Sequence, residues 1–379
     1  MKTKNKFTPH NPIQPIGVEK QEEQGFYNLP TSPASRVIMD IFQAGENLPD
    51  LQERKKQVSH SITYEVGENG QYRFVTYRSD KSEVSVELDN IDKIIGSNKP
   101  AKKLFILSLI KMNEQAVHNG QLTQDYISFP VKELTEIGFY KTYQSASKGF
   151  KSGAEVLTSI KVKGEERKTK KKKISQFALE VLFTGANIER GGQCYIYLNP
   201  RINWGFMLQY FTILPPYYFR LPNRASDLLY YICYLARQKE NARKIEERGY
   251  FTISFRAIHS CLQLPSELQT KNPQRDIKDA IEEAVEQIEN ENKAMYPTLK
   301  DELPDFTMEL VYGEYSSIEE YLENGYLKVM FKGAFAKSFI ELSKNTTKQI
   351  EASKRKSERI QEKAIATNLA KNMEDKPKE

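Results

Sequence analysis

The stretch YISFPVKELTEIGFYKTYQSASKGFKSGAEVLTS, residues 126–159, decides the fold because it predicts three elements in close succession. YISFP (126–130) indicates a short strand, and VKELTEIGF (131–139) indicates a short helix. A second helix follows at about 143–159, where Phe150, Ala154 and Leu157 recur with the spacing of one helix face. A strand followed by two closely spaced helices predicts a helical unit packed on a small sheet.

The flanking sequence extends this unit in both directions. A helix is predicted over 99–117, where apolar residues mark one face, and strands are predicted at 158–163, 174–185 and 192–199. The order over residues 100–200 is therefore helix, strand, helix, helix, strand, strand.

The same order recurs over residues 220–333 in a different sequence. Helices are predicted at 225–238, 255–262 and 275–289, and strands at 250–254, 305–313 and 325–331. An acidic connection joins the last two strands. Because only the order of elements recurs, this is an architectural repeat. We predict an α+β protein with two tandem winged-helix domains and flexible arms at both ends.

The composition places the boundaries of these domains. Residues 1–60 are predicted to be a flexible N-terminal arm, because Pro, Asn, Gln and Ser dominate its first half. Alternating residues at 61–98 indicate a small β unit. The first winged helix is assigned to 99–210 and the second to 211–340. Residues 341–379 are charged, have almost no apolar stripe, and indicate a solvated helix or a disordered tail.

The positive charge is concentrated in one segment. The chain has a net charge of +6, and KVKGEERKTKKKK (161–173) alone has eight basic and two acidic residues. The rest of the chain is therefore neutral overall. This run lies between two predicted strands, so we expect it at the tip of a β-hairpin, the wing of the first domain. A focused positive field indicates an anionic partner.

In a winged helix the last helix enters the major groove, and the hairpin contacts the neighbouring backbone or minor groove. In the first domain, polar residues at the start of that helix face away from its apolar side. Lysines there suit phosphates or guanine edges, and Gln144 can pair bidentately with adenine. The alternative is an ordinary solvated helix face and a solvated lysine loop. The candidate DNA-binding residues of this domain are Lys141, Tyr143, Gln144, Lys148, Lys151, Lys163, Arg167, Lys168, Lys170, Lys171, Lys172 and Lys173.

The second domain has its basic residues at the start of its last predicted helix, where the helix dipole also favours a phosphate. Farther along, acidic residues occupy the exposed face, so only the N-terminal end of this helix can approach DNA. The acidic face suits a protein partner as the alternative. The candidate DNA-binding residues of this domain are Arg256, Lys271, Asn272, Gln274, Arg275 and Lys278.

An aromatic segment joins the two domains. Interleaved aromatic residues can stack on single-stranded bases, but they more often form an interdomain core, which we favour here. The residues are Trp204, Phe206, Tyr210, Phe211, Tyr217, Tyr218 and Phe219.

The sequence provides little support for catalysis. The four histidines are scattered without HxH or HExxH, and there is no GxxxxGK[ST] phosphate loop. Cys194, Cys233 and Cys261 are too widely spaced for a disulfide framework or a zinc cluster, which indicates a reducing interior. No apolar run is long enough to span a membrane, and no secretory signal is present. We expect a cytoplasmic, non-enzymatic protein without catalytic residues, cofactor or metal.

The layout resembles the plasmid replication initiators that bind repeated origin sequences with two winged helices. The resemblance covers about 85–335 and depends on five segments: KPAKKLFILSLIKM, VKELTEIGF, IYLNPRINWGFMLQY, RLPNRASDLLYYICYL and FTISFRAIHSCLQLP. It implies that double-stranded origin DNA and host replication proteins are partners, and that the chain can form a homodimer. In that family the second domain usually binds the repeat, so the acidic last helix predicted here departs from the pattern.

Four hypotheses follow from these observations. The first is a replication initiator of a plasmid or related mobile element. The second is a winged-helix transcriptional regulator, whose DNA chemistry is the same. The third is a nicking, rolling-circle enzyme, and the fourth is an interaction protein with a solvated lysine loop. Several short direct repeats in the neighbouring DNA would favour the initiator over the regulator.

Overall fold

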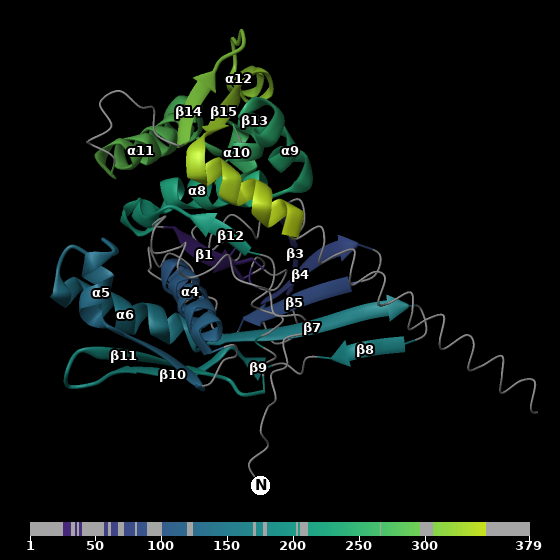
Figure 1. Ribbon diagram of the computed structural model, residues 1–379. Helices are drawn as coiled ribbons and strands as arrows, with labels where there is room; N and C mark the ends of the chain where they lie inside the picture. Colours follow the sequence, from purple (N-terminus) through teal and green to yellow (C-terminus); the bar gives the residue numbers. More distant parts are fainter. Residues whose placement is uncertain are drawn as a thin grey trace, which may run out of the picture.

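The computed structural model describes residues 26–31, 35, 38–39, 57–59, 62–66, 72–79, 82–88, 101–119, 124–169, 172–176, 180–201, 204, 211–265, 267–295 and 306–345. Helices and antiparallel strands are mixed along these ranges, so the predicted α+β class is confirmed. Two units lie one above the other in Figure 1, and a further set of strands projects from the lower unit.

The first unit is a group of helices on one face of a three-stranded antiparallel sheet. Its middle strand is β11, where Cys194, Ile196 and Leu198 are buried and alternate with half-buried residues. This alternation is typical of a strand with one face on the core. In chain order its elements are α4 (Ala101–Asn119), β6 (Tyr126–Pro130), α5 (Val131–Glu136), α6 (Tyr143–Leu157), β10 (Phe183–Ile188) and β11 (Gln193–Leu198).

The second unit has the same order of helices and the same strand order, with β15 between β13 and β14. It differs from the first by three additional helices: α9, α12 and the helical residues 333–345. Its elements are α8 (Asn223–Ala236), α9 (Lys239–Arg248), β13 (Tyr250–Ser254), α10 (Phe255–Cys261), η3 (Glu267–Gln269), η4 (Gln274–Asp279), α11 (Ala280–Met295), β14 (Phe306–Val311), α12 (Ile318–Asn324) and β15 (Tyr326–Phe331).

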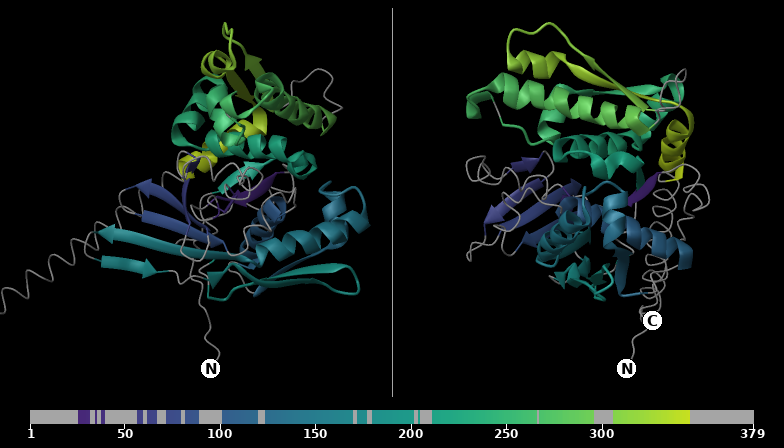
Figure 2. Two further views of the ribbon diagram at one scale, coloured as in Figure 1. Left: turned by 180° about the vertical axis from the view of Figure 1, so that it is seen from behind. Right: turned by 90° about the vertical axis from the view of Figure 1, so that its left-hand side faces the viewer.

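The projecting strands form one seven-stranded sheet from two distant parts of the chain. Strand β5 pairs with β7 over seven residue pairs, so the small β unit predicted at 61–98 continues into the segment after α6. Figures 1 and 2 show this inserted sheet extending away from α5 and α6. Its strands are β2 (Gln57–Ser59), β3 (Ile62–Val66), β4 (Tyr72–Ser79), β5 (Ser82–Leu88), β7 (Ile160–Thr169), β8 (Lys172–Gln176) and β9 (Glu180–Val181).

The register explains why these strands share a sheet. Side-chain positions alternate between the two faces of a strand, so each face can be listed from the pairing alone. One face has apolar rows across β3, β4, β5 and β7, such as Tyr64, Phe74, Val86 and Val162. The other face has a row of alternating charge: Glu65, Arg73, Glu87 and Lys161.

The register also corrects the assignment of the lysine-rich segment. The predicted hairpin is present, because β7 pairs with β8, but it is not the wing of the first unit. The hairpin that completes the three-stranded sheet is β10–β11. Strand β7 instead finds β5, a partner about 75 residues earlier in the chain, with a matching apolar alternation. Local pattern alone does not reveal such a distant partner.

Part of the predicted N-terminal arm belongs to the folded core. Residues Tyr27–Pro30 form β1, which pairs with β12 (Phe211–Leu214), and Leu29 is fully buried. The ring of Phe26 packs against Phe335 of the helical residues 333–345, with centroids 4.7 Å apart. Residues 1–25 of the arm and 346–379 of the tail lie outside the described residues.

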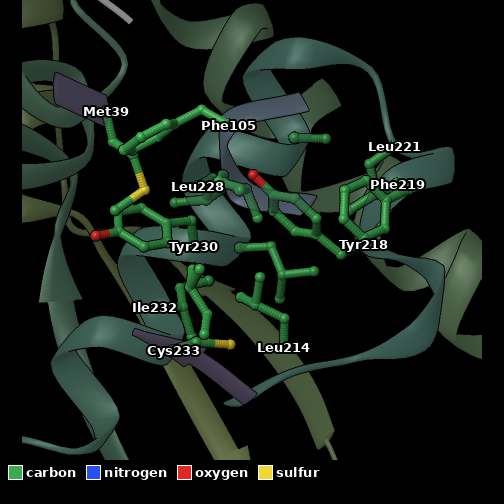
Figure 3. Packing of buried hydrophobic residues seen from close by; sticks show 14 of the residues in the cluster. Met39, Phe105, Leu214, Tyr218, Phe219, Leu221, Leu228, Tyr230, Ile232 and Cys233 are labelled. Carbon is green, nitrogen blue, oxygen red and sulfur yellow. The ribbon is translucent and has the colours of Figure 1, made fainter. Parts of the chain in front are cut away.

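The aromatic segment between the units is a core, as predicted. Tyr217, Tyr218 and Phe219 lie in η2 (Pro216–Arg220) and are fully buried. Figure 3 shows Tyr218 and Phe219 packed with Phe105 of α4 and Tyr230 of α8. Each such side chain contributes roughly 1.5–3 kcal/mol when buried, so this segment holds the two units together. Trp204 is also buried, whereas Phe206 and Tyr210 lie outside the described residues.

Two lysines at the start of α4 add polar contacts between the two units. The Lys103 ammonium donates hydrogen bonds to the carbonyl oxygens of Phe219, at 3.2 Å, and Leu221, at 2.5 Å. Lys102 forms an ion pair with Asp227 of α8. Burial lowers the pKa of Lys103 to about 8. The protein therefore retains a buried cation here because main-chain oxygens surround it.

The pKa of Lys103 predicts a pH-dependent stability. In the unfolded chain its pKa returns to 10.5, so the unfolded state binds more protons above pH 8 and stability rises with pH. From pH 7 to pH 10 we expect the unfolding free energy of the wild type to gain about 2 kcal/mol relative to Lys103→Met. Urea unfolding of both proteins at several pH values measures this difference. Parallel pH curves would contradict it.

Candidate nucleic-acid interface

Helix α6 is held firmly at its start and along one side. Thr142 precedes it in an extended conformation and forms a capping box with Ser145, in which each side chain accepts from the other's main-chain N–H. Phe150 packs edge-on against Phe129 of β6, with ring centroids 6.0 Å apart. Ala146, Ala154 and Leu157 are buried on the same side. The opposite side of α6 therefore has a defined orientation in solvent.

That opposite side presents the residues that the sequence predicted for DNA contact. Gln144, Lys148 and Lys151 recur at i, i+4 and i+7, and all three are exposed. Lys141 and Tyr143 are exposed at the start of the helix, with Tyr143 54% accessible. Among the described residues no carboxylate forms an ion pair with Lys141, Lys148 or Lys151. We call these five residues the α6 surface.

Two further exposed cations come from segments that lie next to the start of α6, and sequence analysis missed both. Arg190 is exposed in the turn between β10 and β11, a turn that closes on α5 through a Val131 N–H to Gly192 carbonyl hydrogen bond of 2.8 Å. Arg220 comes from η2 and lies against Gly138 in the turn before α6, where a Cβ would be 2.4 Å from its Cγ. Gly138 has φ +77°, so that position needs glycine for conformation and space.

The lysine-rich hairpin lies elsewhere. Lys163, Arg167 and Lys168 belong to β7, and Lys172 and Lys173 belong to β8. Register places Arg167 opposite Lys173. Lys170 and Lys171 lie outside the described residues. Both views show the β7–β8 end of the inserted sheet on the side of the molecule away from α5, so this hairpin does not flank the α6 surface.

In the second unit, the predicted basic residues lie around η4, a π-helical turn that opens α11. Lys271 and Asn272 are exposed before it, and Asn272 accepts a hydrogen bond from the Arg275 N–H at 3.3 Å. The Arg275 side chain pairs with Asp276 at 2.8 Å, which raises the pKa of Arg275. Gln274 donates to Asp279 at 3.3 Å. Asn272, Gln274 and Arg275 are therefore already engaged in hydrogen bonds or an ion pair within this turn.

The two remaining cations of the second unit are also engaged within it. Arg256 of α10 contacts Glu319 and Glu323 of α12 at 2.5 and 3.0 Å, and the hydrogen bond to Glu319 raises the pKa of Arg256. Lys278 lies 5.5 Å from the ring centre of Tyr315 and 6.0 Å from that of Tyr321. Both cations therefore brace α12 and its connection instead of pointing freely into solvent.

The surface around α11 is acidic, as the sequence predicted. Asp279, Glu283 and Glu286 are exposed along the helix. The predicted acidic connection between the last two strands contains α12, whose Ile318, Tyr321 and Leu322 are buried while its glutamates face solvent. A negative surface of this kind repels a phosphate backbone. The structure thus makes the two units chemically unequal at corresponding positions.

The described part of the chain gives little support for a metal site or for catalysis by histidine or cysteine. No group of three or more His, Cys, Asp or Glu side chains there is arranged to hold a metal ion. His259 contacts the Pro265 carbonyl oxygen at 2.8 Å. The three cysteines are free thiols, and burial raises the pKa of Cys194 to about 12. None of the described helices has the length and apolarity needed to cross a membrane.

Comparison with known proteins gives only distant similarity. No family model matches the chain, and no curated protein matches it significantly. A crystal structure of RctB domains 2–3 aligns over 73% of this chain and 94% of that one, with a TM-score of 0.38 and 8% identity. A selenomethionine structure of the same two domains aligns over 71% and 92%, with a TM-score of 0.40 and 7% identity. Both TM-scores lie below 0.5, so the similarity is distant.

The pairing of Arg256 predicts a small role for it in binding DNA. Because two carboxylates already hold its guanidinium, we expect Arg256→Ala to change DNA affinity by less than about twofold. The double variant Glu319→Gln, Glu323→Gln releases the guanidinium and should strengthen binding. Fluorescence anisotropy with DNA from beside the gene measures both. A large loss in Arg256→Ala would instead place this residue in the DNA interface.

Proposed function

We propose that this protein is a non-enzymatic, sequence-specific binder of double-stranded DNA, built from two winged-helix units. The observation that supports this most strongly is the α6 surface on a helix with a fixed orientation, where the lysines form no ion pair with any described residue and one amide is exposed beside them. The first unit binds DNA chiefly through this surface. The inserted β7–β8 hairpin supplies further, sequence-independent charge.

The chemistry of the α6 surface suits the major groove. Lys141, Lys148 and Lys151 neutralise phosphates or donate to guanine edges, and Gln144 pairs with the N6 and N7 edge of adenine. The capping box at Thr142 keeps the N-terminal turn of α6 intact, so these groups are positioned before DNA arrives. A preformed helix favours affinity because its backbone need not become ordered on binding.

The role in the cell that we propose is replication initiation for a plasmid or related mobile element. The supporting observation is the resemblance of the segments 99–112, 131–139, 196–210, 220–235 and 251–265 to initiators that bind origin repeats. In this role the protein binds repeated sites and recruits host replication proteins, and the acidic surface of the second unit suits contacts to protein. Footprinting on DNA beside the gene separates the candidates: several protected direct repeats support an initiator, whereas one site over a promoter supports a regulator.

Removing charge from the α6 surface should weaken DNA binding. We expect Lys148→Ala, Lys151→Ala to reduce affinity by about tenfold or more and to lower the slope of log affinity against log salt by roughly two units. Gln144→Ala should instead relax base preference at one position, by about 1–3 kcal/mol.

The matched control is Lys239→Ala, Lys337→Ala, which removes the same charge from exposed positions of the second unit. Binding titrations at several salt concentrations should give near-wild-type affinity for this control. Equal weakening by both double variants would show that binding follows net charge, and the α6 surface would lose its assigned role.

The lysine hairpin should contribute only on long DNA. Because it lies on the side of the molecule away from α5, we expect a duplex confined to the α6 surface, of roughly one helical turn or about 10 bp, not to reach it. Alanine at Lys170, Lys171, Lys172 and Lys173 should leave short-duplex affinity unchanged. On longer DNA it should flatten the salt slope by roughly one unit per lost phosphate contact. An equal loss on both DNA lengths would place the hairpin next to α6.

A further inference from the structure

The turn of the β10–β11 hairpin touches the start of α6 through one side chain. The hydroxyl oxygen of Tyr143 lies over Gly192, so closely that a Cβ on Gly192 would be 2.4 Å from it and 3.4 Å from the ring carbon Cζ. Gly192 also has φ +79°, a conformation that side chains with a Cβ rarely adopt. The positive φ therefore favours glycine at this position, and a Cβ there would displace the Tyr143 hydroxyl.

The rest of the turn is tied down by main-chain hydrogen bonds. The Gly192 N–H donates to Glu189, at 2.9 Å, and the Gly192 carbonyl accepts from Val131 at the start of α5, at 2.8 Å. The neighbouring Gly191 is different, because a Cβ there meets nothing within 4 Å and its φ is not positive. The two glycines thus form a natural matched pair, one packed on Tyr143 and the other open.

The second unit joins corresponding elements in a chemically different way. There Lys278, at the start of the last helix, lies over Tyr315 and Tyr321 in the connection between β14 and β15. In both units, then, aromatic contacts link the connection between the last two strands to the start of a helix, α6 in the first unit and η4–α11 in the second. Contact at the same place in two unlike sequences indicates that the position of this connection matters.

We propose that Tyr143 and Gly192 are positioning residues that hold Arg190 beside the α6 surface, where its guanidinium binds a DNA phosphate. Arg190 stands two residues before Gly192 and is exposed. Its neighbour Glu189 is engaged by the hydroxyl of Tyr195, so its carboxylate is held by the sheet. A planar guanidinium binds a phosphate with two parallel hydrogen bonds, which suits a residue at a fixed hairpin turn.

This inference rests on the proposed DNA-binding function, and two glycine variants test it. Gly192→Ala strains the turn at its positive φ and displaces the Tyr143 hydroxyl from it. We expect about a tenfold loss of DNA affinity, the size of one charge-assisted contact. The salt slope should fall by roughly one unit, because one phosphate contact is lost. Gly191→Ala adds the same methyl group in open space and should bind like the wild type. Circular dichroism and thermal unfolding check that both variants fold.

A cycle with Arg190→Gln separates positioning from stability. Alone, Arg190→Gln should cost about as much affinity and salt slope as Gly192→Ala. In the Gly192→Ala background it should cost almost nothing more, because the displaced arginine no longer reaches the phosphate. Additive losses would overturn the positioning role.

The outcomes also separate this inference from the proposed function. Wild-type affinity in Arg190→Gln would overturn the inference even if Gly192→Ala failed to fold. If the wild-type protein bound no DNA at any salt concentration, the proposed function itself would be wrong. If the wild type bound DNA and Gly192→Ala bound it equally well, only the positioning role of Tyr143 and Gly192 would be refuted.

Discussion

The burial of η2 between α4 and α8 is the constraint on which the rest of the structure depends. Three consecutive aromatic side chains, Tyr217, Tyr218 and Phe219, are buried in the core there. The Lys103 ammonium donates hydrogen bonds to the main-chain carbonyl oxygens of Phe219 and Leu221. Strand β12, which precedes η2, pairs with β1 and so recruits residues 27–30 into the same core. Each unit is thus positioned relative to the other by packing, and a flexible tether between them is not needed.

The two units show how one topology can present opposite chemistry. Each unit has a three-stranded antiparallel sheet, yet the lysines of the α6 surface form no ion pair among the described residues, whereas Arg256, Arg275 and Lys278 contact carboxylates or tyrosines. Helix α12 contributes to this difference, because it supplies Glu319 and Glu323 to Arg256. A division of labour between a DNA-binding unit and a protein-binding unit is consistent with these contacts.

The inserted sheet is a separate part of the structure, and it differs in architecture from the two units. Its apolar face and its row of alternating charges are assembled from two segments separated by the first three helices of the first unit. Placing the basic hairpin at the end of this sheet moves most of the positive charge away from α6. The described basic residues predicted for DNA contact in the first unit therefore lie in two separate places, the β7–β8 hairpin and the α6 surface.

The sequence by itself determined the shared order of three helices and three strands in the two units, but not α9, α12 or the helical residues 333–345 of the second, because apolar periodicity is a local property that burial preserves. It also identified the exposed face of α6, since Phe150, Ala154 and Leu157 define the buried face. Only the tertiary structure decided that β7 pairs with β5, that β10–β11 completes the first sheet, and that the segments of Arg190 and Arg220 lie next to the start of α6. It also decided that Arg256 and Lys278 are already engaged. These outcomes depend on partners far away in the chain, and a pattern of neighbouring residues contains no information about which distant surface a side chain will meet.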